Sequence, residues 1–281
     1  MARRIAGAAA VRLLLVCEGP GDVDDLVVLT HRALRATHPW LADHDEGAPP
    51  WPTWWTFDGR NFLPWRDIDR LCDAHGVPRV QGLGLSLGRR AATRLFRWLS
   101  LAPEALLDQP LRVLLVHDDD GRAGWRASLQ AARDEGLAGC ARTRPSLAVD
   151  AAVGVASPEH EAWVIAAFEP REASARSALE TQQRVLGFDP RTEADRLTSG
   201  REDAPRDAKR VLRALCPDMH QRRALLAEVD LTLLRARGRT TGLADFLEEL
   251  RTRVATAWGY VAPTAPQPVI EDVLLEIDRL C

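Results

Sequence analysis

Acidic side chains gather at three places in the sequence, and each place lies just beyond a short apolar run. The segments read EGPGD at 18–22, HDDDG at 117–121 and PEHEAW at 158–163. Their candidate metal-binding carboxylates are Glu18, Asp22, Asp118, Asp120, Glu159 and Glu161. Close carboxylates raise one another's pKa unless a cation lies between them. Oxygen ligands of this kind suit Mg²⁺ or Mn²⁺, and such ions can drive the hydrolysis of a phosphodiester.

Each acidic segment also has a purely structural interpretation. Asp22 could cap a helix and complement its dipole. The Asp120-Gly121 pair is typical of an ordinary turn, and Glu159 could be an acid favoured in the first turn of a helix. Glu18 has no capping partner in the sequence. In an extended segment, residues i and i+2 point the same way, so Asp118 and Asp120 could share one ion.

The apolar runs before the acidic segments have the length of strands. They cover 11–17, 111–116 and 151–156, and helical spacing follows at 23–35, 124–135 and 159–168. This alternation predicts an α/β fold, a mainly parallel sheet with helices on both faces. Because ligands bind at the carboxyl edge of such sheets, we expect the three acidic segments to converge there.

The pattern divides the chain into two regions. Residues 1–170 are expected to form the α/β domain, with a tryptophan- and proline-rich insertion at about 38–66. Residues 171–281 are expected to form a helical C-terminal region packed on that domain, with amphipathic spacing that extends to a last helix at 270–280.

The composition of the chain excludes several classes of protein. The net charge of −3 excludes a polycation that coats nucleic acid, and 46% hydrophobic residues indicate a globular chain. The five cysteines are widely spaced without a CxxC pair, which favours a reducing compartment. The apolar N-terminal run is interrupted by Arg12, and no run reaches membrane-spanning length. We therefore expect a cytoplasmic protein without a membrane segment.

The acidic motifs together resemble the Toprim domain found in topoisomerases, bacterial-type primases and OLD-family nucleases. Glu18-Gly19-Pro20-Gly21-Asp22 is similar to its glutamate motif, and Asp118-Asp119-Asp120 to its Asp-x-Asp motif. The PEHEAW segment resembles a Pro-Glu-x-Glu-x-Trp signature of small stand-alone Toprim-like proteins, in which a lysine follows well downstream. The spacing between the first two motifs is long for a minimal Toprim domain, and the chain has no GxxxxGK[ST] segment for an ATPase.

The resemblance implies a nuclease dependent on Mg²⁺ or Mn²⁺. Glu18, Asp22, Asp118 and Asp120 would bind the metal, with Glu159 and Glu161 as candidates for a second position. Glu18 could instead act as a general acid or base. Lys209, the one lysine among 37 basic residues, would place its charge against the scissile phosphate; the alternative is a solvated helix lysine. An ATPase partner in a bacterial anti-phage system would be a separate chain.

Several side chains could contact nucleic acid, and we expect DNA as the partner more than RNA. Arg89, Arg90 and Arg94 form a basic run that could follow a phosphate backbone, although a solvated helix face would read the same way. His117, beside the aspartates, could be a ligand or lie behind one. A homo-oligomer is compatible with the sequence. The alternative function is a non-catalytic subunit that uses the same scaffold to bind nucleic acid or a partner protein.

Overall fold

The computed structural model describes residues 11–46, 50–80, 86–103, 107, 109–120, 122–198, 201 and 204–258. Within these residues the chain forms a five-stranded sheet in which every pairing is parallel. The strands are β1 (Arg12–Cys17), β2 (Thr53–Trp54), β3 (Leu63–Pro64), β4 (Leu111–Asp118) and β5 (Val149–Ala156). Their order is β2-β1-β4-β5, and β3 pairs with the second half of β1. The predicted parallel α/β sheet is confirmed.

The register of the three longer strands brings their carboxyl ends to one edge. Along β4 and β5 the pairing runs from Leu111 opposite Val149 to Asp118 opposite Ala156. Strand β1 pairs with β4 in parallel, from Arg12 opposite Leu111 to Val16 opposite Leu115. The residues that directly follow β1, β4 and β5 therefore leave the sheet side by side.

Side chains of the central strands are buried on both faces. Along β1, Leu13 and Leu15 belong to one apolar core, whereas Leu14 and Val16 belong to the other. The first core is covered by α1 (Pro20–Thr37) and α10 (Leu243–Glu249). The second core is covered by α2 (Ile68–Ala74), α3 (Leu87–Leu101) and α4 (Trp125–Thr143). Burial on both faces explains why these strands read as continuous apolar runs.

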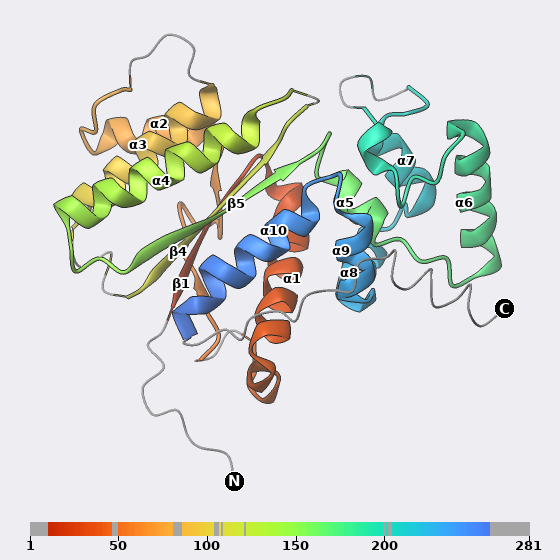
Figure 1. Ribbon diagram of the computed structural model, residues 1–281, viewed down its shortest axis with the longest axis horizontal. Helices are drawn as coiled ribbons and strands as arrows, with labels where there is room; N and C mark the ends of the chain where they lie inside the picture. The colour runs from red at the N-terminus through yellow and green to blue at the C-terminus, as the bar shows by residue number, and fades with distance from the viewer. Residues whose placement is uncertain are drawn as a thin grey trace, which may run out of the picture.

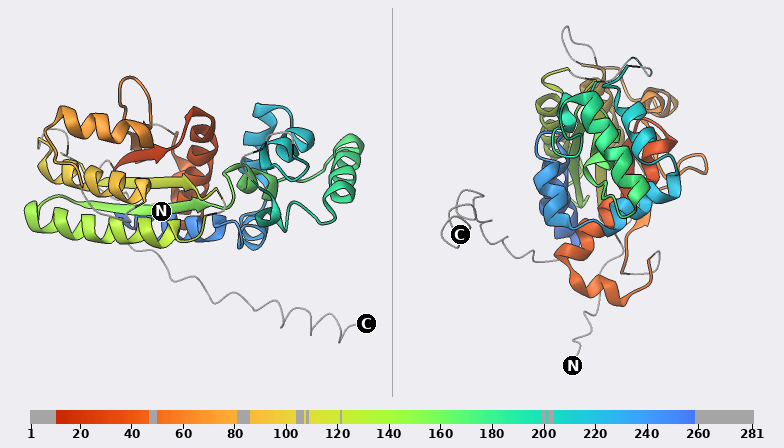
Figure 2. Two further views of the ribbon diagram at one scale, coloured as in Figure 1. Left: turned by 90° about the horizontal axis from the view of Figure 1, so that it is seen from above. Right: turned by 90° about the vertical axis from the view of Figure 1, so that its right-hand side faces the viewer.

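The remaining helices are α5 (Glu161–Ala166), α6 (Ala173–Leu186), α7 (Ala208–Leu215), α8 (Met219–Glu228) and α9 (Leu231–Arg237). Helices α6 and α7 lie beyond the end of the sheet (Figures 1 and 2). The chain then returns, since α10 and the π-helical turn Leu250–Val254 pack against β5. The helical C-terminal region is thus observed, whereas a domain boundary at residue 170 stays a prediction. Residues 259–281, with the helix expected at 270–280, lie outside the described residues.

The tryptophan-rich segment 38–66, expected as an insertion, is part of the sheet. It supplies β2 and β3, which extend the sheet beside β1. The side chain of Trp51 is buried, and its Nε1 donates to the carbonyls of Leu41 and His44 at 3.1 and 3.0 Å. The segment therefore has its own apolar anchor and forms one edge of the sheet.

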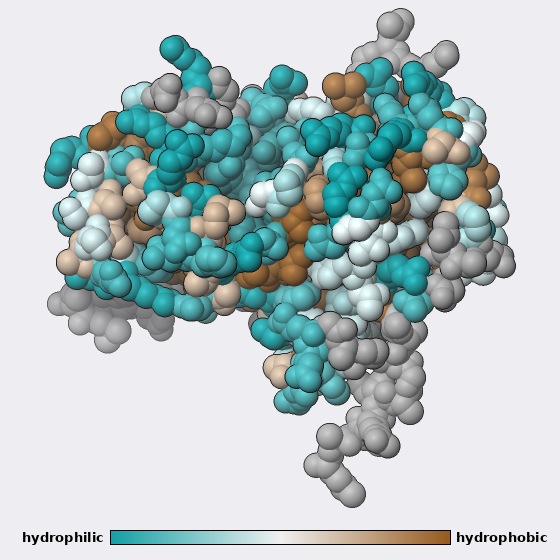
Figure 3. Space-filling model, turned by 180° about the vertical axis from the view of Figure 1, so that it is seen from behind, coloured by the Kyte–Doolittle hydropathy of each residue, from teal (hydrophilic) through white to brown (hydrophobic). Residues whose placement is uncertain are grey.

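Most of the surface seen from behind is polar, with apolar residues in scattered patches (Figure 3). Among the described residues, no helix combines the length and apolar character needed to cross a bilayer.

Candidate active site

The first two acidic segments meet at the ends of neighbouring strands. Glu18 directly follows β1, and Asp118 is the last residue of β4. The backbone N–H of Asp118 lies 3.4 Å from Glu18 Oε1, so the Glu18 carboxylate reaches across the end of β4. Asp118 lies deeper in the molecule than its neighbour Asp120, which is exposed.

The third segment is attached to the second by backbone hydrogen bonds. The N–H of Asp119 donates to the Ala156 carbonyl at 2.9 Å, and the N–H of Asp120 donates to the Pro158 carbonyl at 3.1 Å. The N–H of His160 donates to Asp118 Oδ1 at 2.9 Å. These contacts hold the 158–161 turn against the end of β4, as expected from the parallel order.

Asp22 combines the structural and the functional interpretation. It lies in the first turn of α1, and the N–H of Gly19 donates to its Oδ2 at 3.3 Å, which makes it part of a capping box. Its other oxygen, Oδ1, lies 3.7 Å from His160 Nδ1. The cap therefore fixes this carboxylate so that one oxygen faces the 158–161 turn.

The electrostatics of Asp118 show how closely the carboxylates are grouped. Burial raises the pKa of Asp118 to about 9, and the negative charges of neighbouring acids add to the effect. In order of decreasing influence these acids are Glu18, Asp22, Glu161 and Glu159. Burial likewise raises the pKa of the Cys17 thiol, together with Asp22, Glu18 and Asp118. Five carboxylates from three strand ends thus form one electrostatic unit, hereafter the acidic cluster (Glu18, Asp22, Asp118, Glu159 and Glu161).

Lys209 reaches the acidic cluster from α7. Its Nζ donates to Glu159 Oε1 at 3.1 Å, although about 44% of the lysine side chain remains exposed. Burial opposes its positive charge, but the hydrogen bond to Glu159 and the charges of Glu161 and Asp118 outweigh burial and raise the Lys209 pKa. The structure therefore places this lysine beside the carboxylates, 50 residues away in sequence from Glu159.

Asp120 does not follow the expected geometry. Its φ of 49° lies in the left-handed region, which a non-glycine residue adopts in turns. The alignment with Asp118 that an extended segment would impose is therefore wrong here, because the chain turns as soon as β4 ends. A role for Asp120 as a metal ligand stays a prediction.

The sequence offers His117 as a possible ligand, but it does not identify the two tryptophans that lie beside this histidine. His117 Nδ1 lies 3.0 Å from Glu18 Oε1 and also contacts the Asp118 carbonyl, so it must carry a proton to donate to these acceptors. The His117 ring stacks on Trp125 with centroids 4.0 Å apart and tilts against Trp65 at 5.4 Å. Trp65 is fixed in turn, since its Nε1 donates to the Val116 carbonyl at 2.6 Å. No local sequence pattern joins these residues.

A buried layer beneath Asp22 was also missed. The side chains of Asp25 and His160 are buried, and His160 Nε2 has no hydrogen-bond partner within the described part of the chain. Burial raises the pKa of Asp25, while His160 acts in the opposite direction. The three-residue spacing of Asp22 and Asp25 places both on one face of α1, which is the signal that could have found this layer.

The basic run on α3 divides into two parts. Arg94 is only 2% exposed, and its guanidinium pairs with Asp69 and Asp73 and donates to the Val77 carbonyl at 2.8 Å. Its assignment to nucleic-acid contact is therefore wrong: this arginine fastens α2 to α3. Arg89 and Arg90 lie in the first turn of α3 and are half-buried, and Arg89 pairs with Glu135 at 2.8 Å.

The residues of the acidic cluster fit Mg²⁺ or Mn²⁺ by their chemistry. All its donors are carboxylate oxygens, which hard divalent ions prefer. Glu159 is 5% exposed and its Oε2 is buried without a hydrogen-bond partner in the described chain, as expected of an atom that awaits a cation. As the side chains lie, the described residues contain no group of three or more His, Cys, Asp or Glu close enough to hold an ion. Binding of an ion would therefore require these carboxylate side chains to move closer together.

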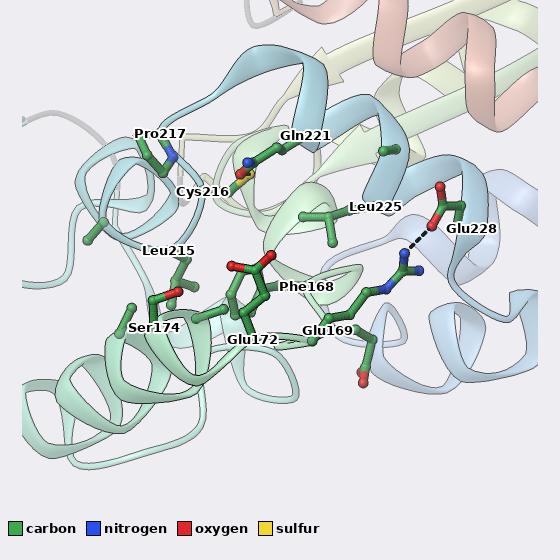
Figure 4. Close-up of a pocket in the computed structure, with 15 residues that line it drawn as sticks. Phe168, Glu169, Glu172, Ser174, Leu215, Cys216, Pro217, Gln221, Leu225 and Glu228 are labelled. Atoms are coloured by element: carbon green, nitrogen blue, oxygen red, sulfur yellow. Dashed lines mark hydrogen bonds and ion pairs between the residues drawn. The ribbon is translucent and has the colours of Figure 1, made fainter.

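A separate cavity of about 430 Å³ lies among α6, α8 and the end of α7 (Figure 4). Its wall is apolar at Phe168, Leu215 and Leu225, and an ion pair between Arg171 and Glu228 crosses its rim. None of the acidic cluster lines this cavity, so it is distinct from the candidate active site.

Comparison with protein-family models, with curated proteins and with solved structures gives no match for this chain.

Proposed function

We propose that this protein is a metal-dependent nuclease that hydrolyses phosphodiester bonds of nucleic acid. The observation that supports it is the convergence of carboxylates from three strand ends with one lysine at their border. Burial, with the added effect of the neighbouring carboxylates, raises the pKa of Asp118 to about 9, so these acids need a cation before all of them can ionise near neutral pH. A bound Mg²⁺ or Mn²⁺ would supply that charge, activate water and stabilise the leaving oxygen.

The protein's own residues then have separate tasks. Glu18, Asp22 and Asp118 would hold the ion, with Glu159 and Glu161 at the border of the cluster. His117, fixed by Trp65 and Trp125, orients the Glu18 carboxylate through the 3.0 Å contact. Lys209 would transfer its hydrogen bond from Glu159 to a phosphate oxygen, which places positive charge where negative charge develops.

The Toprim resemblance extends the proposal to the biological setting. It supports an effector subunit in the cytoplasm of a bacterium, acting in anti-phage defence with an ATPase on a separate chain. DNA is the substrate that the resemblance favours.

A second candidate is a non-catalytic scaffold that binds nucleic acid or a partner protein. It is favoured by the ion pair between Lys209 and Glu159, which already neutralises part of the acidic cluster. A scaffold of this kind would need neither a divalent ion nor Asp118.

A cleavage assay separates the two candidates. Plasmid DNA and RNA are incubated with the full chain and Mg²⁺ or Mn²⁺, in parallel with Asp118→Asn and with Asp43→Asn, an exposed carboxylate outside the cluster. The nuclease proposal expects cleavage by the parent and by Asp43→Asn, at least 100-fold above Asp118→Asn. Equal cleavage by parent and Asp118→Asn, or none with either metal, would overturn it. Lys209→Arg keeps the charge, so loss of cleavage there would assign a role to the compact ammonium.

A further inference from the structure

A second, smaller cavity borders the acidic cluster on the other side of the turn after β4. Its volume is about 260 Å³, below the range of drug-sized ligand sites. Three arginines line it. Arg122 comes from the loop before α4, Arg126 from the start of α4, and Arg239 from the loop between α9 and α10. Asp119 also lines it, between Asp118 and Asp120, so the cavity and the acidic cluster share one loop. We call it the arginine pocket.

The loop that carries Arg239 is held firmly against the end of β5. The Thr241 carbonyl accepts hydrogen bonds from the N–H of Ser157 at 3.0 Å and from Trp163 Nε1 at 2.8 Å. Gly242 has a φ of +84°, and a Cβ there would lie 2.1 Å from the Val155 carbonyl oxygen. Only glycine permits this close approach. The fold thus brings Arg239 and Arg122 into the lining of one pocket, although they are 117 positions apart in the sequence.

The charges of the arginine pocket are only partly balanced. Two acids line the pocket. Asp119 already takes part in another interaction, and Asp245 forms an ion pair with Arg126. Within the described part of the chain, the guanidinium groups of Arg122 and Arg239 form no ion pair, and both residues are exposed. Two exposed guanidinium groups that line one pocket and form no ion pair with a described carboxylate suit the bidentate recognition of a phosphate.

We infer that the arginine pocket binds a backbone phosphate of a single nucleic-acid strand, so that a neighbouring phosphodiester lies at the acidic cluster. This inference rests on the proposed nuclease function and names how its substrate is held. The cavity is too small for a large ligand and carries the charge that the acidic cluster lacks. Because guanidinium groups contact the phosphate and not the base, binding is independent of sequence.

Binding is tested without catalysis. Anisotropy of a labelled 20-nucleotide DNA single strand is measured with the full chain in EDTA at several salt concentrations. The double variant Arg122→Gln/Arg239→Gln should weaken binding about tenfold and lower the salt slope by about 2. The control Arg142→Gln/Arg184→Gln removes the same charge at exposed positions outside the pocket and should leave binding near that of the parent. Asp245→Asn frees Arg126 and should tighten binding.

Several results would overturn the inference. If both double variants weaken DNA binding equally, net charge alone determines the affinity. If the parent does not bind the DNA strand, nucleic acid is not the ligand of the arginine pocket. Displacement of the strand by millimolar inorganic phosphate would assign the pocket to a free anion. Glu18→Gln separates this inference from the proposed function, since it should abolish cleavage and retain binding. Cleavage with unchanged affinity in the Arg122→Gln/Arg239→Gln variant would refute the pocket and leave the nuclease intact.

Discussion

Replacing Asp118 by asparagine should change how the stability of the metal-free protein depends on pH. The pKa of Asp118 rises from its ordinary value of 3.8 to about 9 on folding, so the folded state binds this proton more tightly than the unfolded state. The resulting stabilisation is complete below pH 3.8 and is lost as the pH rises towards 9. An asparagine side chain at this position would have no proton to lose, and it could still accept the hydrogen bond from the His160 N–H.

The size of the effect follows from linkage. Between the two pKa values the free energy of unfolding falls by at most about 1.4 kcal/mol per pH unit. From pH 6 to pH 8 the limit is therefore about 3 kcal/mol, and the partial solvent contact of Asp118 reduces our expectation to about 1–2 kcal/mol. For a chain of this size, the Tm of the parent should therefore fall by about 2–8 °C more than the Tm of Asp118→Asn between pH 6 and pH 8.

Thermal unfolding in EDTA at pH 6 and pH 8 measures this difference. The parent should be close to Asp118→Asn at pH 6 and less stable than it at pH 8. Asp43→Asn, at an exposed position, serves as the control. If the parent and Asp118→Asn lose stability equally between the two pH values, burial and the neighbouring carboxylates do not raise the pKa of Asp118 in the folded protein.

Three further results are expected. Arg94→Met removes the buried partner of Asp73 and should lower the free energy of unfolding by about 2 kcal/mol in urea titration, with no loss of DNA affinity in the folded variant. A Cβ at Gly154 would lie 2.8 Å from the Phe246 ring, so Gly154→Ala should destabilise the protein by about 1–3 kcal/mol; a cost near zero would show that α10 does not pack on β5 as observed. The affinity for Mn²⁺ should rise up to about tenfold per pH unit between pH 6.5 and 8.5, because Asp118 must lose its proton to bind the ion. Isothermal titration calorimetry at several pH values measures this, and an affinity that does not change with pH would contradict the prediction.

The sequence predicted the parts of the fold that have long patterns. Apolar runs that are buried on both faces identified β1, β4 and β5, and helical spacing identified α1, α4 and α5. Strands β2 and β3 have two residues each, and two residues carry no periodicity. Their pairing with β1 depends on the tertiary placement of the tryptophan-rich segment.

The candidate site divides in the same way. Glu18, Asp22 and Asp118 were found because strand ends converge in a parallel sheet, a rule that needs only the order of elements. The stacking of His117 on Trp125 was not predicted, because it arises only in the folded chain. Arg94 resembled a surface arginine, since nothing in its own helix shows that acids of α2 neutralise it.

Metal binding by the acidic cluster is measured by titrating the metal-free full chain with Mn²⁺ at pH 8 and following the free ion by electron paramagnetic resonance. We predict saturable binding of Mn²⁺ that Mg²⁺ displaces, weakened at least tenfold by Asp118→Asn and by Glu18→Gln and unchanged by Asp43→Asn. Absence of saturable binding, or equal binding by the parent and Asp118→Asn, would contradict the account of the acidic cluster as a metal-dependent active site.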